Sequence, residues 1–552
     1  MLRNLALVAA YLSAQVSSHD VSDHQQHLSA ANVPAKKVAI IGAGAGGSSA
    51  AFHLSQYAAL AGIPTNITIF ERSSYIGGRS TTVHAYDAPA LPVELGASIF
   101  VSVNRVLMDA VAHFNLSSNG YSEVIVDEDE DESDNGRDFM GVWDGHEFVL
   151  TAPEDMGWLD KAKLMWKYGL APIRAMRLMR KTVGTFLQMY EEPHFPWASL
   201  TEKVHELGLV NATAATGEEF LRKNGIGGAF AHDVVQASTR VNYAQNLARI
   251  NGLLSMVCMA TDGAMSVDGG NWRIFSHLAH AATHDIRLNT SVSALIKRSD
   301  ATYTLIPQDS TTSALRAPEH FDAVILAAPY HSANISIPAL PEHVPDAIPY
   351  VKLHVTLFAS PHRLAASAFN LPDGTPVPQV VLTTLGKSDD ARGDDSPARV
   401  GAAGFFSISA LRRVRNPRTG QREYLYKIFS PAPVTGGFLA RILGVADDAS
   451  NDDREDGVGE AVGAGDVTWI YRKVWESYPF EYPRVTFEEV RLDQELWYTS
   501  AVEGFISTME TSALAGKNVA RLIVDGWVGG KEGRKVGASE GVVEEEDGVK
   551  EL

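Results

Sequence analysis

Glycines at fixed spacing, between an apolar run and a run of small residues, are the part of the sequence best suited to chemistry. Gly42, Gly44 and Gly47 follow Val38–Ile41. The apolar run predicts a strand buried on both faces, and the Ser/Ala-rich run from Ser48 to about Tyr57 predicts a helix packed on that strand. Gly42 would allow the tight turn, Gly44 would let backbone N–H groups approach a pyrophosphate, and Gly47 would let the helix lie against the sheet. The pattern predicts a dinucleotide-binding site.

An acidic residue and two further small-residue segments follow this helix. A second predicted strand, Asn66–Phe70, leads into Glu71, whose carboxylate could accept hydrogen bonds from ribose hydroxyls and would repel a 2′-phosphate. NADP is therefore disfavoured. Gly77-Gly78-Arg79 and Glu94–Ser98 come next in the chain. Two such segments so close to the ribose position suit a cofactor that lies extended along the protein, which a nicotinamide enzyme does not need.

This layout resembles the FAD-binding domain shared by flavin amine oxidases and their relatives, and later segments fit the same resemblance. A predicted strand at Ile286–Val292 resembles the one that places its Val against the adenine, and Phe321–His331 resembles the strand that re-enters the FAD domain. A final helix from about Ser507 to Val524, aimed N-terminus first at the flavin pyrimidine, would stabilise the negative charge of the reduced ring. The expected cofactor-binding residues are Gly42, Gly44, Gly46, Gly47, Glu71, Arg72, Gly77, Gly78, Arg79, Gly96, Ala97, Ser98, Val292, Ala328, Pro329 and Met509.

Length and composition predict more than one domain, since 552 residues can bury large cores. We expect an α/β protein (α+β overall), with a Rossmann-like FAD-binding domain and a second, mixed substrate-binding domain. The FAD-binding domain is expected at residues 36–110, 226–334 and 481–528. The substrate domain is expected to have a helical part at 111–225 and a mixed part at 335–480, with an acidic insertion at 445–465; a disordered tail is expected at 529–552.

The net charge of −19 argues against a nucleic-acid partner, which would need clustered Lys and Arg. Acidic runs at Asp127–Asp134, Asp447–Asp456 and Glu540–Asp547 are interpreted as solvated loops or tails. The single cysteine, Cys258, cannot form an intrachain disulfide and lies in an apolar segment typical of a packed side chain. The His-rich residues 19–35 show no ligand spacing, so no metal site is expected.

The N-terminus has the pattern of a secretory signal. Arg3 precedes an apolar run from Leu5 to Leu12 and small residues around Ser13–Ser18, so residues 1–18 are interpreted as a signal peptide and 19–35 as a flexible lead-in. Sequons of the form Asn-x-Ser/Thr support entry into the secretory pathway and glycosylation; they begin at Asn66, Asn115, Asn211, Asn289 and Asn334.

From Met156 to Tyr190, Met, Trp, Leu and Tyr alternate with Lys and Arg at the period of long amphipathic helices. Periodicity alone favours helix packing in a second domain. Met and aromatic side chains could instead line a pocket for a flexible apolar substrate. The basic and apolar surface could also make a peripheral contact with a membrane. The sequence leaves these three interpretations open.

Several blocks together resemble the prenylcysteine oxidase (prenylcysteine lyase) family, over nearly the whole chain after the signal. The more specific blocks are Arg240-x-x-Tyr243-x-Gln245, Val267–Asn271, and Ala501-x-Glu503 leading to Lys517–Ala520. Blocks that add to these are Ile40–Ala51, Gly77–Arg79, Met165–Gly169, Asp233–Val235 and Ala328–His331.

This resemblance implies a secreted or lysosomal (vacuolar) flavoprotein that binds FAD without a covalent bond and cleaves farnesyl- or geranylgeranyl-L-cysteine in the degradation of prenylated proteins. In that chemistry a hydride passes from the prenyl carbon attached to sulfur to flavin N5. Water adds to the resulting thiocarbenium, the adduct collapses to cysteine and a prenyl aldehyde, and O₂ reoxidises the flavin to give hydrogen peroxide. Positioning then matters more than acid or base catalysis, because the cofactor carries out the hard step. Tyr243 and Gln245 are the expected catalytic, orienting residues, although they could instead only cap and pack their helix.

Two residues depart from the pattern that we expect of the family: Ser500 stands in place of an amide residue, and Gly504 stands in place of an aromatic one. Because both lie near the expected active site, two alternatives stay open. One is a flavin oxidase of the same architecture that acts on another apolar amine, thioether or prenylated metabolite. The other is a secreted flavoprotein that binds lipid or a partner, with weak or no oxidase activity. The oligomeric state also stays open.

Overall fold

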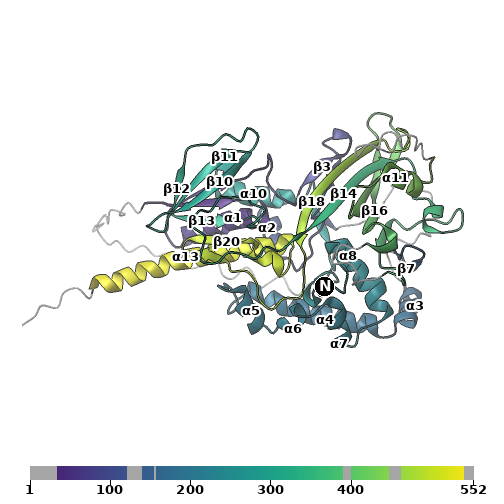
Figure 1. The fold of residues 1–552 in the computed structure, drawn as a ribbon, viewed down its shortest axis with the longest axis horizontal. Coiled ribbons are helices and arrows are strands. Elements are labelled where there is room, and N and C mark those ends of the chain that lie inside the picture. The colour runs from purple at the N-terminus through teal and green to yellow at the C-terminus, as the bar shows by residue number, and fades with distance from the viewer. Residues whose placement is uncertain (1–33, 121–139, 154–156, 390–399, 447–461, 540–552) are drawn as a thin grey trace, which may run out of the picture.

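The computed structural model of the chain describes residues 34–120, 140–153, 157–389, 400–446 and 462–539. The predicted signal peptide, nearly all of the lead-in, the three acidic runs and residues 540–552 of the predicted tail lie outside these ranges. Figure 1 shows two sheet-containing lobes side by side, with a layer of helices beneath the second lobe. The mixed α/β class expected from the sequence is confirmed.

A six-stranded sheet forms the core of the first lobe, in the order β19-β20-β13-β1-β2-β9. The apolar run before Gly42 forms β1, which lies at the centre, fully buried at its carboxyl end, and pairs in parallel with β2 and β13. The strands come from three distant parts of the chain: β1 (Lys36–Ile41) and β2 (Thr65–Phe70), then β9 (Ile286–Arg287) and β13 (Ala323–Leu326), then β19 (Arg491–Asp493) and β20 (Leu496–Tyr498).

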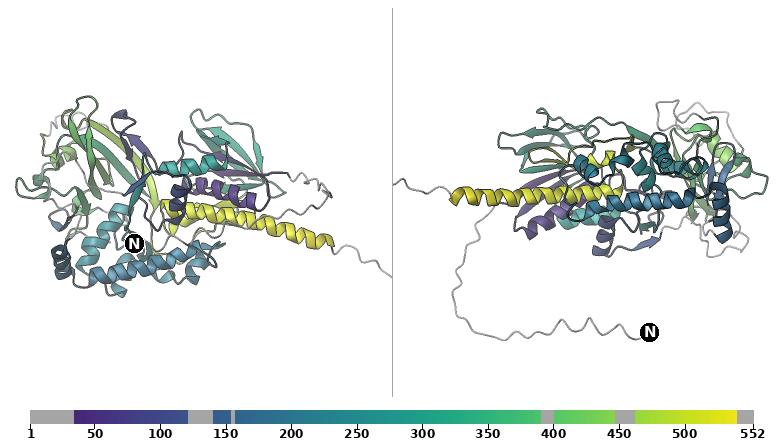
Figure 2. Two further views of the ribbon diagram at one scale, coloured as in Figure 1. Left: turned by 180° about the vertical axis from the view of Figure 1, so that it is seen from behind. Right: turned by 90° about the horizontal axis from the view of Figure 1, so that it is seen from below.

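Four helices pack around this sheet. They are α1 (Ala45–Leu60), α2 (Arg105–His113), α10 (Trp272–Ala282) and α13 (Met509–Ser539). Figure 2 shows α13 running alongside α1, with α10 on the other side of α1. The close approach of α1 and α13 depends on Gly516, where an added Cβ would lie 2.2 Å from the carbonyl oxygen of Gly46. Helix α1 begins three residues before the predicted Ser48.

One predicted strand is wrong, and residues 530–539 of the predicted disordered tail are helical. The segment Ile286–Val292 forms two strands rather than one, because Asn289 adopts a left-handed φ of 50° and turns the chain. Its first part, β9, pairs with β2, and its second part begins β10, which pairs with β11 in a separate small sheet. Helix α13 continues ten residues past Gly529 to Ser539, where a disordered tail was expected. The small sheet comprises β10 (Thr290–Lys297), β11 (Tyr303–Asp309) and β12 (Glu319–Phe321).

A seven-stranded sheet forms the second lobe, in the order β18-β14-β17-β16-β15-β6-β7. Two of its strands, β6 and β7, come from residues 111–225, which the sequence analysis predicted as helical. This prediction was wrong because a short hairpin of apolar residues lies between the acidic run and the amphipathic helices. The strands are β6 (Met140–Trp143), β7 (Phe148–Ala152), β14 (Tyr350–Ser360), β15 (Val380–Thr383), β16 (Ser407–Arg415), β17 (Arg422–Ser430) and β18 (Trp469–Pro479), and α11 (Gly436–Leu443) covers one face.

Helices beneath the second lobe connect it to the first. The amphipathic segment Met156–Tyr190 gives two long helices and a short turn, as its period predicts. Helix α8 ends at Tyr243, because Ala244 adopts a left-handed φ of 52°. The helices are α3 (Trp158–Tyr168), α4 (Ala171–Phe186), η3 (Leu187–Tyr190), α5 (Leu200–Glu206), α6 (Val210–Thr213), α7 (Gly217–Lys223), η4 (Ala231–Val235), α8 (Gln236–Tyr243) and α9 (Gly252–Val257).

Short elements complete the connections. These are β3 (Thr82–His84), η1 (Ala85–Asp87), β4 (Pro92–Glu94), β5 (Ser118–Gly120), β8 (Met265–Val267), η5 (Ala366–Phe369), η6 (Gly401–Ala403) and η7 (Ser500–Gly504).

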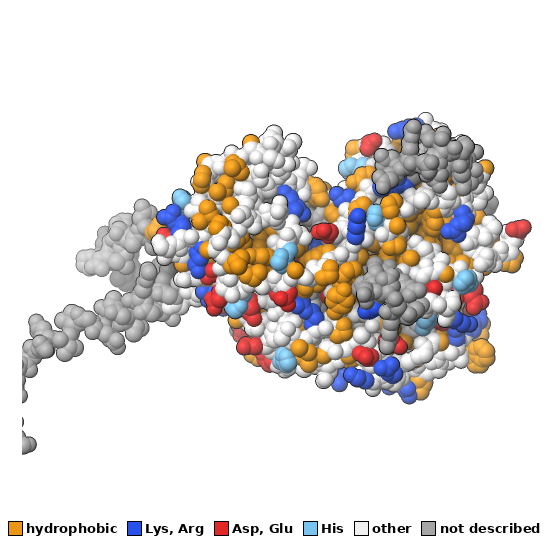
Figure 3. Space-filling view, viewed as in Figure 1, with side chains coloured by type: hydrophobic (Ala, Val, Ile, Leu, Met, Phe, Trp, Pro, Cys, Tyr) orange, Lys and Arg blue, Asp and Glu red, His pale blue; other side chains and the backbone are white. Residues whose placement is uncertain are grey.

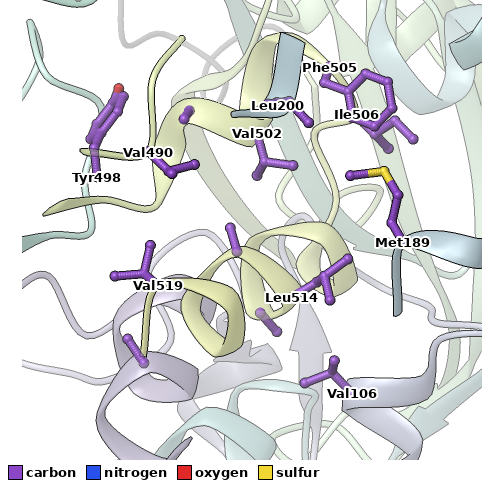
Figure 4. Close-up of a cluster of buried hydrophobic side chains, with 14 of the residues drawn as sticks. Val106, Met189, Leu200, Val490, Tyr498, Val502, Phe505, Ile506, Leu514 and Val519 are labelled. Carbon is purple, nitrogen blue, oxygen red and sulfur yellow. The ribbon is translucent and has the colours of Figure 1, made fainter. Parts of the chain in front are cut away.

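The start of α13 is fixed by a cluster of buried apolar side chains. Figure 4 shows Val502, Phe505, Ile506 and Leu514 converging with Met189 of η3 and with side chains of α2 and α5. Since each of these side chains is at most 3 % exposed, the turn between β20 and α13 is held by packing from several elements.

A buried carboxylate beside this cluster should make stability depend on pH. Glu510 accepts hydrogen bonds from the N–H groups of Val106 (2.9 Å) and Leu107 (3.0 Å) at the start of α2. Burial nevertheless raises the pKa of Glu510 from 4.5 to about 7. A raised folded-state pKa stabilises the fold below the unfolded value, and this contribution disappears as the pH rises through the folded value.

We therefore expect the free energy of unfolding of the wild type to lose up to about 3 kcal/mol from Glu510 between pH 4.5 and 7. Glu510→Gln should lack this loss, so in urea unfolding its free energy of unfolding should rise relative to that of the wild type from pH 5 to pH 8. A difference that stays constant over this range would contradict the prediction.

Candidate functional site

Three loops meet at the carboxyl ends of β1, β13 and β20. We call this end of the six-stranded sheet the carboxyl-end edge. The loop after β1 touches both of the others. At Gly42, with φ of 109°, an added Cβ would lie 2.6 Å from the carbonyl oxygen of Ala327, and at Gly46 it would lie 2.7 Å from Oγ1 of Thr499. Ligands of open α/β sheets bind in the crevice outside the carboxyl ends of the strands, so this edge is the candidate cofactor site.

The N-terminus of α1 points its free backbone donors at this edge. Gly44 is the N-cap, and within the described residues no side chain caps the helix and its first turn has no acidic residue. The Gly77-Gly78 loop passes beside it, through a bridge between Gly44 and Gly77. An added Cβ at Gly44 would meet no atom closer than 3.9 Å, so the space over the loop is open. The loop therefore fits a pyrophosphate, which free N–H groups and the helix dipole would bind.

Glu71 holds a carboxylate at the mouth of the same loop. The residue is buried, and its two carboxylate oxygens accept hydrogen bonds from the N–H groups of Ala43 (2.8 Å) and Ser73 (2.7 Å). Each oxygen keeps a lone pair that could accept a ribose hydroxyl. The neighbouring Arg72 is exposed, and its guanidinium donates a hydrogen bond to the carbonyl of Ser332, in the segment after β13.

Arg79 connects the cofactor edge to the second lobe. Its guanidinium donates to the carbonyl of Ser477 in β18 (2.7 Å) and to a carboxylate oxygen of Glu503 in η7 (2.6 Å). The other oxygen of Glu503 accepts a hydrogen bond from the Tyr350 hydroxyl of β14 (2.9 Å). Burial raises the pKa of this tyrosine, so its proton stays in place. The chain of contacts holds the two lobes together beside the site.

A buried lysine of the second sheet reaches the Gly96–Ser98 loop. Lys427 of β17 donates hydrogen bonds to the carbonyl of Glu94 (3.0 Å) and to Oγ of Ser98 (2.8 Å), and Ser98 in turn donates to the carbonyl of Gly96. Burial raises the pKa of the Glu94 carboxyl to about 7, although a hydrogen bond from the Asn271 N–H and the charge of Lys427 both lower it. Lys427 was not among the residues expected from the sequence, although a single lysine within the apolar run of β17 could have indicated it.

Asn271 fixes the same loop from the other side. Its side-chain amide donates to the carbonyl of Ala97 (2.9 Å), and its side-chain oxygen accepts from the N–H of Val267. Gly269 and Gly270, just before it, both adopt positive φ. The Val267–Asn271 block thus positions the Gly96–Ser98 loop through the side-chain amide of Asn271, which contacts the carbonyl of Ala97.

Tyr243 lies between the second lobe and the start of α13. Its hydroxyl donates to the carbonyl of Ser507 (3.2 Å), two residues before α13, and its ring lies 5.1 Å from that of Tyr478 in β18. Gln245 has a different role. Its amide nitrogen donates to the carbonyls of Tyr243 and Pro479, and its oxygen accepts from the N–H of Glu481. Gln245 therefore caps α8 and connects it to the segment after β18, while its expected catalytic role stays a prediction.

The remaining predicted cofactor residues occupy three places around the edge. Val292 is buried in β10, two residues after Thr290, whose N–H donates to the carbonyl of Glu71. Ala328 and Pro329 follow β13. Met509 is half-buried at the first position of α13. All three places adjoin the carboxyl-end edge, with Val292 on the side of β2.

The two departures from the expected family pattern lie in a pocket between the lobes. Ser500 and Gly504 line it, together with Glu503, Tyr330, Tyr350 and Tyr498. An added Cβ at Gly504 would lie 2.7 Å from Nη1 of Arg484, so the arginine occupies the space where we expected an aromatic ring. The exchange makes this corner of the pocket more polar.

No metal site is found in the described part of the chain, since no three His, Cys, Asp or Glu side chains there are placed to share an ion. Cys258 is buried, and burial raises the pKa of its thiol.

Tyr243→Phe tests whether the hydroxyl does more than hold α13. If it only donates to Ser507, we expect retained cofactor, a loss of about 1 kcal/mol in the free energy of unfolding, and less than a tenfold decrease in kcat/KM. A decrease of 100-fold or more with unchanged stability would instead show that the hydroxyl acts on the reacting groups. Steady-state kinetics and urea unfolding of the same preparation separate these outcomes.

The two-lobed fold is also found in two amine oxidases of known structure. A redesigned putrescine oxidase is similar with a TM-score of 0.53 and 13 % identity, covering 89 % of this chain and 99 % of the other. Cyclohexylamine oxidase from Brevibacterium oxydans IH-35A is similar with a TM-score of 0.52 and 14 % identity, covering 90 % and 100 %. Residues 40–114 match the family model of the NAD(P)-binding Rossmann-like domain.

Within that fold class, the chain belongs to the prenylcysteine lyase family, whose model matches residues 152–534. It is 27 % identical over 508 residues to the farnesylcysteine lyase of Arabidopsis thaliana, covering 88 % of each chain. It is 24 % identical over 516 residues to prenylcysteine oxidase 1 of Homo sapiens, covering 90 % of each.

Proposed function

We propose that the protein is an FAD-dependent oxidase that cleaves S-prenyl-L-cysteine. The observation that carries this proposal is that relatives named for this activity match about nine-tenths of the chain, so that both lobes are included. The open, uncapped loop at Gly44 and the carboxylate of Glu71 support a retained dinucleotide site. With O₂ as acceptor the reaction balances: prenyl thioether, O₂ and water give prenyl aldehyde, cysteine and hydrogen peroxide.

The residues at the carboxyl-end edge would hold FAD without a covalent bond. The N-terminus of α1 would bind the pyrophosphate, Glu71 the ribose, and the start of α13 at Met509 the pyrimidine end of the flavin. When bound, the flavin supplies hydride acceptance and passes the electrons on to O₂. A thioether bond from the protein is disfavoured, because the chain's one thiol, Cys258, is buried with a raised pKa.

The chain's own contribution would be positioning. Lys427 and Asn271 hold the Gly96–Ser98 loop, while Arg79, Glu503 and Tyr350 hold the second lobe against the cofactor edge. Removing a hydride from a carbon next to sulfur needs no side-chain nucleophile, so geometry dominates the rate.

The deciding experiment is anaerobic mixing of the purified protein with S-farnesyl-L-cysteine while the visible spectrum is recorded. Bleaching of an oxidised-flavin band, followed by peroxide and prenyl aldehyde on admission of air, is the expected result. Cyclohexylamine and a polyamine serve as comparison substrates, because the fold is that of amine oxidases. A flavin band that bleaches only with an amine would overturn the thioether assignment, and a protein without a flavin band would overturn the cofactor assignment.

The same proposal includes the secretory pathway, with a lysosome, vacuole or the extracellular space as destination. The asparagines of all five sequons are exposed, which supports glycosylation. A shift in mass on treatment of the protein, made in a eukaryotic host, with an N-glycosidase would test it; an unchanged mass would count against this route.

A further inference from the structure

Helices α3 and α4, which lie in the lower part of the view in Figure 1, carry large apolar side chains that are exposed. Trp166 is 92 % exposed and Trp158 is 77 % exposed. Leu159, Leu170 and Met176 are also exposed. The opposite sides of the helices pack into the core through Tyr168, Ala175, Met179 and Val183. We call the exposed side, from Trp158 to Lys181, the α3–α4 surface.

The α3–α4 surface is strongly basic although the chain has a net charge of −19. Asp160 is the one acidic residue between positions 158 and 181. Among the described residues, two lysines of this surface form ion pairs with carboxylates: Lys163 with Asp160, and Lys167 with Asp233. Figure 3 shows Lys and Arg mixed with apolar side chains along the lower edge of the molecule. The basic residues of this surface are Lys161, Lys163, Lys167, Arg174, Arg177, Arg180 and Lys181.

We propose that the α3–α4 surface docks onto an anionic lipid bilayer. Exposed Trp and Leu on a helix flanked by Lys and Arg suit the boundary between headgroups and acyl chains, where indole rings gather. Each basic side chain near an anionic surface contributes about 1 kcal/mol. In the described residues no helix is long and apolar enough to pass through a membrane, so the contact would be peripheral.

The surface is tied to the helix that carries Tyr243. At the end of α3, the Tyr168 hydroxyl donates to Asp233 (2.8 Å), and Nζ of Lys167 lies 3.0 Å from the same carboxylate. Asp233 belongs to η4, which continues directly into α8. A docked bilayer would therefore lie on the helix that directly contacts the element leading to the site. Where the proposed function holds, this arrangement brings the enzyme to a prenylated amphiphile that partitions into lipid.

Flotation of the flavin-containing protein with substrate-free vesicles tests the docking independently of turnover. We expect binding to vesicles of phosphatidylcholine with phosphatidylserine, weakening at high salt, and at least tenfold weaker binding to phosphatidylcholine alone. The double variant Trp158→Ser/Trp166→Ser and the double variant Arg177→Glu/Arg180→Glu should each lose at least tenfold in binding. Leu60→Ser, at an 87 % exposed leucine of α1, should bind as the wild type does.

Retained flavin absorbance shows that each variant is folded. Absence of vesicle binding by the wild type, or equal binding by the tryptophan variant, would overturn the proposal. Light scattering that shows a dimer lost in the tryptophan variant, without vesicle binding, would assign the surface to a second copy of the chain. Vesicle binding that appears only after deletion of residues 127–134 would show that this acidic segment is the occupant of the α3–α4 surface.

Discussion

Gly47→Ala should yield a protein that purifies with less than a tenth of the wild-type flavin content. An added Cβ at this position would lie 1.9 Å from the carbonyl oxygen of Gly42 and 3.1 Å from the Cβ of Ala327. Both neighbours belong to the core of the sheet edge, so α1 itself would have to move away from β1. We expect a cost of about 3 kcal/mol and a widened phosphate loop. The ratio of flavin to protein absorbance measures the result.

Two other glycines provide matched controls for Gly47→Ala. At Gly46 the added Cβ would meet Oγ1 of Thr499 at 2.7 Å, a side chain that can rotate, so Gly46→Ala should lose less flavin than Gly47→Ala. At Gly184, inside α4, nothing lies within 4 Å, so Gly184→Ala should keep the cofactor and gain about 0.5 to 1 kcal/mol in stability. Full flavin content in Gly47→Ala would contradict the assignment of the loop.

Lys427→Met should keep the flavin and lose about 100-fold in kcat/KM. The substitution removes the hydrogen bonds to the carbonyl of Glu94 and to Oγ of Ser98, each worth about 1.5 to 3 kcal/mol for a charged donor. The Gly96–Ser98 loop would then be held from one side only, by Asn271. A displacement of about 1 Å in a positioning element is enough for such a loss.

The pH dependence gives Lys427→Met a second readout. The charge of Lys427 lowers the pKa of the Glu94 carboxyl, which burial raises to about 7. Without that charge this pKa should rise further, so any limb of the pH–rate profile that reports Glu94 should move to higher pH. Lys352→Met, at an exposed lysine of β14 in the same sheet, is the control and should change neither readout. Unchanged kinetics in Lys427→Met would show that the loop does not need the lysine.

Secondary structure could be predicted from the sequence where neighbouring residues determine it. The strand before Gly42, the turn, the helix after it and the acidic end of β2 depend on local pattern, and the structure contains all four. Local pattern was insufficient at Asn289, where a single left-handed residue divides a predicted strand.

Contacts between distant segments were outside the reach of sequence reasoning. Arg79 and Glu503 are 424 residues apart, and Lys427 meets Ser98 across 329 residues. No periodicity specifies which partner such a side chain finds. The sequence also does not indicate that the guanidinium of Arg484 fills the space at Gly504 where an aromatic ring was expected.

The assembly of the six-stranded sheet from three chain segments determines when the site can form during translation. Strand β1 is synthesised before its neighbour β13, which follows about 280 residues later, and β20 and α13 follow β13. At about 5 to 20 residues per second, the nascent chain carries an incomplete sheet with unpaired strand edges for most of its synthesis. The six-stranded sheet is therefore complete only after β20 and α13 have been synthesised, so a chain cut before α13 should fail to retain flavin.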